Sequence, residues 1–244
     1  MLMSVAGATL TLSFDGTIKK TRYPIMPFLA SIEGQCGYGR PRQQATGTVE
    51  FNYTNFASTA GLTQVSTAGV ISNLLYLTTA VNGDVGNVYR STAIPYNRNF
   101  SFEWNFECAG GSSPPADGFC LQWTTTNNTN GTAGGGVGYL SSAVNAFTFL
   151  TYTNNLFTWY KNDVAQTTQT GQNFYRNLFY WADYTHSTST MRIYFSTTNT
   201  KPASANFTLS NFSFGATSYY IGFGAATGGA NANHILRSMK LTFT

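Results

Sequence analysis

The C-terminal stretch YYIGFGAATGGANANHILRSMKLTF (Tyr219–Phe243) shows most clearly which kind of structure this chain forms. Apolar residues alternate with polar or small ones from Tyr219 to Phe223, and again from Met239 to Phe243. Alternation with a period of two places the apolar side chains on one face of a β-strand. The intervening residues, Ala226–Asn233, are rich in the glycine and asparagine typical of turns. The stretch therefore predicts two strands joined by a loop.

The same alternation recurs along the chain and predicts an all-β protein. Loops rich in Gly, Pro, Asn and Ser separate the segments, and no apolar stripe keeps helical spacing for three turns. Only Ile71–Leu77 is predicted to form a short helical turn. Many short strands of this kind indicate a β-sandwich or jelly roll. The further predicted strands are Val49–Tyr53, Phe100–Phe106, Phe119–Trp123, Phe147–Tyr152, Phe157–Lys161 and Met191–Phe195.

Composition excludes several classes of protein. Of 244 residues, 42% are hydrophobic and only 9% are charged, against about 25% charged in an average soluble domain. The hydrophobic content excludes disorder, and no apolar run approaches the ~20 residues of a membrane-spanning helix. The net charge is +4, and the basic residues are scattered instead of gathered on one face. Nucleic acid is therefore not an expected partner.

The N-terminal residues differ from the rest. Residues 1–45 contain a basic cluster (Lys19–Arg22) and three prolines, and are predicted to form an arm or hairpin extension before a main sandwich at 46–244. Met1–Phe14 has no Lys or Arg, and its apolar residues alternate with Ser, Gly and Thr. A secretory signal needs a basic region followed by an apolar run. No cleaved signal peptide is expected.

Cysteines and Asn-x-Ser/Thr sequons give this chain candidate sites for two kinds of covalent modification. Cys108 and Cys120 flank a Gly/Ser/Pro loop on consecutive predicted strands, so a disulfide and two buried thiols are both open alternatives. An N-linked glycan needs an Asn-x-Ser/Thr sequon, although a chain this rich in Asn, Ser and Thr also produces sequons by chance. The sequons are at Asn52, Asn99, Asn127, Asn130, Asn206 and Asn211.

Five ordered segments resemble the legume-type (L-type) lectin family. The stretch at Tyr219–Phe243 is similar to that family's final two strands, and PADGFCLQW (Pro115–Trp123) to its Ala-Asp-Gly loop with the following strand. GGGVGYL (Gly134–Leu140) resembles its glycine loop. Val85–Tyr96 and Thr200–Phe212 fit two further segments in the right order. The resemblance implies a jelly roll of two large antiparallel sheets, with loops gathered above one of them.

The resemblance also implies a carbohydrate-binding site. In the family an Asp carboxylate accepts hydrogen bonds from two sugar hydroxyls, which matches the acceptor capacity of an ionised carboxylate. Carried over by motif, that residue is Asp117; the alternative is a turn acid that hydrogen-bonds its own Asp-Gly turn. The other positions implied are a glycine N–H donor, an amide, a stacking ring and a variable loop: Gly135 or Gly136, Asn154 or Asn155, Tyr152, and Gly229, Ala230 and Asn231.

The family's two metal ions are not expected. Family members hold calcium and a transition metal with a Glu-x-Asp strand motif, but this chain has Thr148 and Leu150 at those positions. Calcium takes six to eight oxygen ligands, usually including carboxylates. The next acid, Asp163, falls in a predicted hairpin turn. These metals fix a cis peptide before the binding Asp in the family, and the sequence leaves the isomer of Ala116–Asp117 open. No cofactor is expected.

The sequence is compatible with three functions. The first is a non-catalytic lectin-like surface protein that binds glycan around Asp117. The second is a coat, capsid or fibre subunit in which residues 1–45 dock to neighbouring copies, which implies a homo-oligomer on a virion or surface appendage. The third is a glycoside hydrolase using Glu103 and Glu107. The segment Glu103–Glu107 resembles the Glu-x-Asp-x-Glu strand of one class of retaining glycosidases, but Asn105 stands in place of the central Asp. Catalysis is the least favoured of the three.

Overall fold

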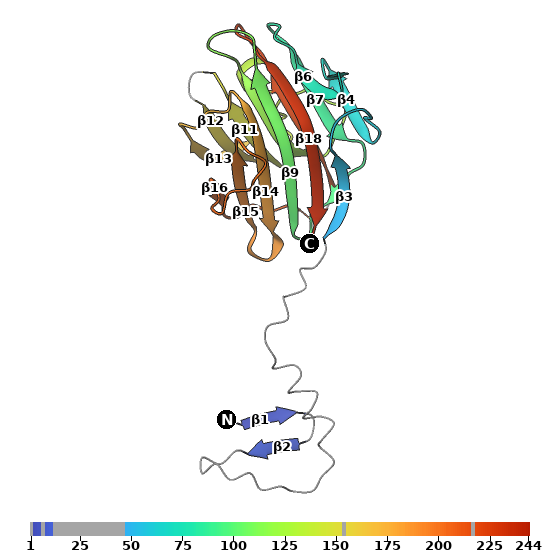
Figure 1. The fold of residues 1–244 in the computed structure, drawn as a ribbon, viewed down its shortest axis with the longest axis vertical. Coiled ribbons are helices and arrows are strands. Elements are labelled where there is room, and N and C mark those ends of the chain that lie inside the picture. The colour runs from blue at the N-terminus through green and yellow to red at the C-terminus, as the bar shows by residue number, and fades with distance from the viewer. Residues whose placement is uncertain (1, 6–7, 12–46, 153–154, 216–217) are drawn as a thin grey trace. The chain divides into compact units, whose positions relative to one another are not determined.

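The computed structural model describes residues 2–5, 8–11, 47–152, 155–215 and 218–244. The chain divides into two compact units, 1–45 and 46–244. The described part of the first unit is a hairpin of β1 (Leu2–Val5) and β2 (Ala8–Thr11). The second unit is a sandwich of two antiparallel sheets (Figure 1). The predicted all-β jelly-roll fold is confirmed.

We name the sheet that contains β10, the strand after Asp117, the front sheet, and the other one the back sheet; in the view of Figure 1 the back sheet faces the reader. The strand order of the front sheet is β13-β12-β11-β10-β17-β7-β4, and β8 pairs with β17. The strand bounds are β4 Leu62–Ser66, β7 Val85–Arg90, β8 Ile94–Pro95, β10 Gly118–Thr124, β11 Asn145–Leu150, β12 Leu156–Lys161, β13 Val164–Gln169 and β17 Ser218–Ala226.

The back sheet has the order β16-β15-β14-β9-β18-β6-β5, and β3 pairs with β18. Its two longest strands, β9 and β18, lie side by side in the middle (Figure 1). Two single 3-10 turns, η1 (Gly134–Gly136) and η2 (His186–Thr188), complete the described elements. The strand bounds are β3 Thr48–Tyr53, β5 Gly69–Ile71, β6 Leu74–Thr78, β9 Phe100–Ala109, β14 Asn177–Thr185, β15 Thr190–Ser196, β16 Phe207–Leu209 and β18 Asn233–Phe243.

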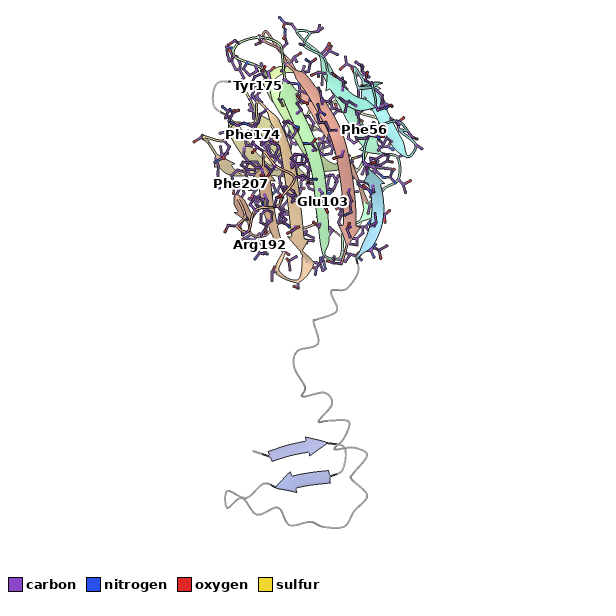
Figure 2. All side chains as sticks on the ribbon, in the orientation of Figure 1. Phe56, Glu103, Phe174, Tyr175, Arg192 and Phe207 are labelled. Atoms are coloured by element: carbon purple, nitrogen blue, oxygen red, sulfur yellow. The ribbon has the colours of Figure 1, made fainter. Side chains whose placement is uncertain are left out.

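Aromatic side chains fill the space between the sheets, among them Phe56, Phe174 and Phe207, which Figure 2 labels. The alternation in β9 buries Phe102, Trp104 and Phe106. Phe106 reaches across to the front sheet and stacks on Phe119, with ring centroids 3.9 Å apart. Burial of one such ring stabilises the fold by about 1.5–3 kcal/mol, and the pairing of two rings adds about 0.5–1.5 kcal/mol. The core therefore fixes the two sheets against each other.

The helical turn predicted at Ile71–Leu77 is wrong. The segment forms the end of β5, a two-residue turn and most of β6. Ser72 and Asn73 both have positive φ, 51° and 63°, which is the geometry of a tight hairpin turn. Cross-strand pairing with β18, which no local pattern reveals, settles the conformation of this apolar run.

The disulfide alternative for Cys108 and Cys120 is also wrong. Both are free, buried thiols. Cys108 belongs to β9 of the back sheet and points into the core between the sheets. Cys120 belongs to β10 of the front sheet and packs with Val137 and Tyr139 in a separate cluster. The strands follow each other in sequence, but they lie in different layers and are not paired.

Candidate functional site

Asp117 stands where three elements of the front sheet meet. Its N–H donates to the Ala226 carbonyl at the end of β17, at 2.9 Å. Its own carbonyl accepts from the N–H of Thr151, just past β11, also at 2.9 Å. The Ala116–Asp117 peptide bond is cis, which settles the isomer that the sequence left open. The Asp117 backbone is therefore anchored on both sides.

The Asp117 carboxylate points toward glycine backbone. Its Oδ2 atom is buried and has no hydrogen-bond partner among the described residues. A Cβ atom added to Gly228 would lie 2.8 Å from this oxygen, and one added to Gly134 would lie 3.9 Å from it. Burial raises the pKa of the Asp117 carboxyl above its usual value. Within the described residues, Oδ2 is therefore a partly desolvated acceptor beside two glycines. It makes no hydrogen bond within the Asp-Gly turn, which was the alternative role for Asp117.

The glycine loop, whose Gly134 lies beside Asp117 Oδ2, contains one amide without a partner among the described residues. Within the described residues, the N–H of Gly134 donates to the Thr227 carbonyl (3.2 Å), and that of Gly136 donates to Ala133 (3.2 Å). The N–H of Gly135 has no partner there, and an added Cβ would meet nothing within 4 Å. Sequence reasoning left Gly135 and Gly136 as alternatives. The geometry favours Gly135 as the available donor.

Buried polar side chains fasten the glycine loop to the front sheet. Asn87 on β7 donates to the Gly138 carbonyl (2.8 Å) and accepts from the N–H of Gly131 (2.9 Å). Gln122 on β10 donates to the same carbonyl (3.2 Å) and accepts from the N–H of Leu140 (2.9 Å). Buried polar groups are costly unless they are paired. These two side chains therefore hold the loop in place, and sequence reasoning missed both.

A second loop, residues 79–84, supports the variable loop beyond β17. Thr227 Oγ1 donates to the Val81 carbonyl (2.6 Å) and accepts from the N–H of Asp84 (2.8 Å). Asn82 donates to the Gly229 carbonyl (3.1 Å) and accepts from the Asn231 amide. The only signal for this support in the sequence is an Asn-Gly turn at 82–83. The Asn231 side chain is thus engaged with Asn82.

The remaining predicted site residues differ in availability. Tyr152 is 40% exposed and follows directly on Thr151, which is hydrogen-bonded to Asp117. Asn155 accepts from the N–H of Phe174 at 3.2 Å, so its carbonyl oxygen is occupied. Ala230 is partly exposed, and its carbonyl accepts from the N–H of Gly228 (3.0 Å). Asn154 lies outside the described residues.

The residues at the family's metal positions do not fit calcium. Thr148 is buried on β11, and Leu150 ends that strand with an apolar side chain. Asp163 lies in the β12–β13 hairpin turn and accepts a hydrogen bond from Tyr139 at 3.0 Å. Across the described residues, no three His, Cys, Asp or Glu side chains gather as a metal cluster. Hydrogen bonds to Ala226 and Thr151 hold Asp117 instead.

Glu103 and Glu107, the pair considered for catalysis, lie on the outer face of the back sheet. Glu103 pairs with Lys240 at 3.4 Å, and Glu107 pairs with Arg237 at 2.6 Å. Asn105 between them donates to the Leu178 carbonyl at 2.9 Å. Each carboxylate is neutralised by a separate cation on β18. The arrangement does not bring two carboxyl groups to one reacting bond.

Comparison with solved structures establishes the fold. The chain is similar to the lectin of Bauhinia forficata solved with GalNAc, with a TM-score of 0.66 and 20% identity over 80% of this chain and 97% of that one. It is also similar to the metal-free lectin I-B4 of Griffonia simplicifolia, with a TM-score of 0.67 and 18% identity over 78% of this chain and 97% of that one. For the VIP36 exoplasmic/lumenal domain bound to Ca²⁺ and Man3GlcNAc, the TM-score is 0.65 and the identity is 17%, over 75% of this chain and 83% of that one. No family model and no curated protein matches the sequence. The described residues of the second unit, 46–244, have the L-type lectin fold.

Within the described residues, the chain contains no helix of the length and apolarity that a membrane-spanning segment requires.

Proposed function

We propose that this chain is a non-catalytic lectin-like protein that binds glycan at Asp117 without a metal ion. The buried, unpaired Oδ2 atom of Asp117 is the observation that carries the proposal. A sugar hydroxyl that donates to this oxygen would meet glycine backbone and no side chain at residues 228 and 134, because both are glycines beside Oδ2. Hydrogen bonds to a charged acceptor are roughly twice as strong as neutral ones.

Two nearby groups complement the carboxylate. The free N–H of Gly135 supplies a donor for a second sugar oxygen. The exposed ring of Tyr152 supplies an apolar face for the sugar ring. Together they give an acceptor, a donor and a stacking surface, the mixture of few polar groups and apolar contact that small-ligand sites use. Location outside the cytoplasm, on a cell or virion surface, is part of this proposal.

A glycan array tests the function directly. The intact chain is compared with Asp117→Ala and with Asp183→Asn, a control in which an acid on the back sheet, paired with Lys201, loses its charge. We expect binding of the intact chain and of Asp183→Asn, and loss for Asp117→Ala. Equal binding by all three proteins would overturn the assignment of the site.

A structural role in a coat, capsid or fibre is the second candidate. It is favoured by three exposed aliphatic side chains on β3 and β5 of the back sheet: Val49 (51%), Val70 (39%) and Ile71 (50%). Exposed strand edges with apolar side chains promote association. We expect sedimentation of the full chain to reveal oligomers that dissociate in an Ile71→Lys variant. A monomer at all concentrations would remove this candidate.

A further inference from the structure

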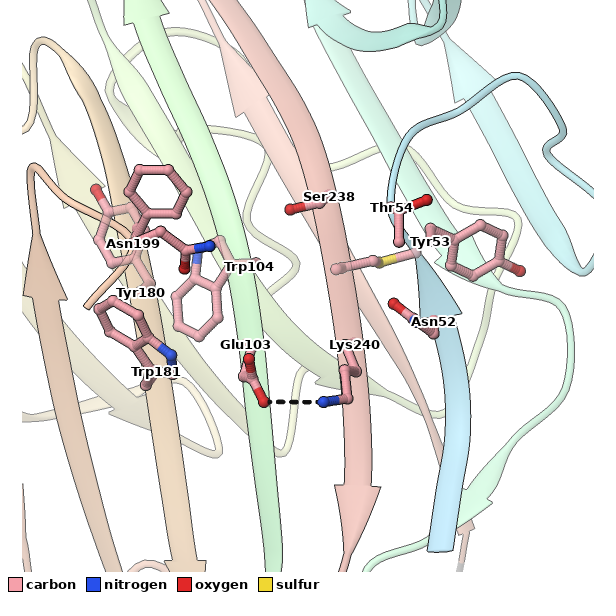
Figure 3. Close-up of a pocket in the computed structure, with 12 residues that line it drawn as sticks. Asn52, Tyr53, Thr54, Glu103, Trp104, Tyr180, Trp181, Asn199, Ser238 and Lys240 are labelled. Atoms are coloured by element: carbon pink, nitrogen blue, oxygen red, sulfur yellow. Dashed lines mark hydrogen bonds and ion pairs between the residues drawn. The ribbon is translucent and has the colours of Figure 1, made fainter. Parts of the chain in front are cut away.

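A groove crosses the outer face of the back sheet, away from Asp117. Its volume is about 300 Å³, and residues of β3, β9, β14 and β18 line it together with Thr54 and Asn199. Figure 3 shows the groove with Trp181 on one side and Asn52 on the other. This size lies at the lower end of the range of small-molecule pockets, about 300–1,000 Å³.

The groove lining combines aromatic rings with neutral hydrogen-bonding groups. Phe179 and Trp181 of β14 contribute aromatic surface; Phe179 is partly exposed and Trp181 is 6% exposed. The amide of Asn52 and the hydroxyl of Ser238 have no hydrogen-bond partners within the described residues. The charged residues of the lining, Glu103 and Lys240, form an ion pair at 3.4 Å.

These features select among ligand classes. The two charges cancel, so the groove offers no net charge to a phosphate or a nucleic acid. Hydroxyls and amides make it too polar for a lipid chain. The floor strands β9, β14 and β18 are paired on both sides within the sheet, so a peptide could not add to it as a strand. A polyhydroxylated ligand with apolar C–H faces fits both the amides and the rings.

We propose that this groove is a second saccharide-binding site, which takes a neutral glycan. The ring face of the sugar lies against the Phe179–Trp181 wall, and its hydroxyls bond Asn52, Ser238 and the oxygens of Glu103. Asn52, Tyr53 and Thr54 line the groove and also form a sequon. The saccharide therefore comes either from outside or from a glycan attached to Asn52 itself.

The test uses the full chain made in bacteria, which leaves the sequons unmodified. Every protein sample carries Asp117→Ala. Failure of the site at Asp117 then cannot be confused with failure of the groove. A neutral-glycan array identifies a binder, and tryptophan fluorescence gives its affinity. Ser238→Tyr fills the groove and Asn52→Ala removes an exposed amide. The matched control is Arg192→Ala, an exposed residue of β15 in the same sheet that does not line the groove.

We expect at least one neutral glycan to bind the Asp117→Ala protein. Ser238→Tyr and Asn52→Ala should each weaken that binding about tenfold, which corresponds to about one or two lost polar contacts, and Arg192→Ala should leave it unchanged. The absence of any binder would overturn the proposal, and so would a binder that tolerates both groove variants.

A second arm identifies the source of the sugar. The same protein is secreted from eukaryotic cells, and mass spectrometry verifies a glycan on Asn52. The comparison is the bacterial protein, whose Asn52 amide is unmodified. If added glycan binds the bacterial protein but not the secreted one, the attached glycan is the groove's occupant. If added glycan binds both equally, the occupant comes from outside. Binding to the secreted protein alone would contradict the proposal.

Discussion

The buried Oδ2 atom of Asp117 faces Gly228 so closely that a Cβ atom at residue 228 would lie 2.8 Å from it. The two residues are far apart in sequence, at the start of β10 and just past β17. The N–H of Asp117 donates to Ala226 at the end of β17, and this bond brings them together. A side chain at residue 228 would therefore press on the carboxylate at the place where the proposed ligand hydroxyl binds.

This relationship gives a matched pair of variants. Gly228→Ala should displace the Asp117 carboxylate and weaken glycan binding at least about tenfold, the equivalent of about one charged hydrogen bond. Gly69→Ala should leave binding unchanged, because Gly69 lies on β5 of the other sheet and an added Cβ there comes no closer than 3.9 Å to its nearest neighbour, the Thr67 carbonyl oxygen. Calorimetric titration of both variants provides the measurement. Equal losses in the two would show that the space beside Asp117 is not used.

The anchoring of the glycine loop makes Gln122 important for stability. Gln122→Leu leaves the buried N–H of Leu140 without a partner, and an unsatisfied buried group costs about 1–3 kcal/mol. We expect urea denaturation to show a loss of that size. Gln166→Leu is the control, because Gln166 is exposed on β13 and a surface change of this kind stays within about 0.5 kcal/mol. No difference between the two variants would argue against the anchoring role.

His234 predicts an acid sensitivity. It is fully buried, its Nδ1 lies 2.7 Å from Thr78 Oγ1, and burial lowers its pKa to about 3. The unfolded chain binds this proton near pH 6.5, whereas the folded chain does not until about pH 3. The unfolding free energy should therefore fall as the pH drops below about 6.5, by up to about 1.4 kcal/mol per pH unit from this group.

Urea denaturation between pH 7 and pH 4 measures this slope. His234→Gln retains a polar side chain without a proton to gain, so its slope should be shallower than that of the unmodified chain. His186→Gln, at the exposed turn η2, should keep the original slope. Parallel curves for all three proteins would remove His234 as the cause.

The two buried cysteines should be inert in the folded protein. Burial raises the pKa of both thiols well above the usual range, and the thiolate is the reactive form. The chain has a third cysteine, Cys36, which is replaced by Ser for this test. Iodoacetamide should then label neither Cys108 nor Cys120 until denaturant is added, after which mass spectrometry should find two labels. No label in the unfolded, unreduced protein would indicate a disulfide between the two.

The sequence predicts much of the fold because alternation is a local property. Phe102, Trp104 and Phe106 alternate with outward residues, and this alone gives β9 its buried face. Ser72–Asn73 could not be identified as a hairpin turn, because the pairing of β6 with β18 joins segments more than 150 residues apart. The same limit applies to Cys108 and Cys120, since no local pattern assigns consecutive strands to different layers.

The candidate site is less predictable than the fold. Motifs locate Asp117 and the glycine loop, but only the backbone geometry distinguishes the free amide of Gly135 from the engaged amide of Gly136. The support from Asn87, Gln122 and the loop at 79–84 comes from strands and turns that carry no motif of their own. Their roles depend on three-dimensional contacts with carbonyl and N–H groups of other segments.

Glycan binding through Asp117 in the absence of metal is the central claim, and isothermal titration of the strongest array binder tests it most directly. The titration is run with the intact chain and with Asp117→Asn, each with EDTA and with added calcium. We predict the same affinity for the intact chain in both solutions, with loss of measurable binding in Asp117→Asn. The affinity of the intact chain should also weaken as acid protonates the carboxyl, whose pKa is raised by burial. Binding that disappears with EDTA, or that survives in Asp117→Asn, would contradict the claim.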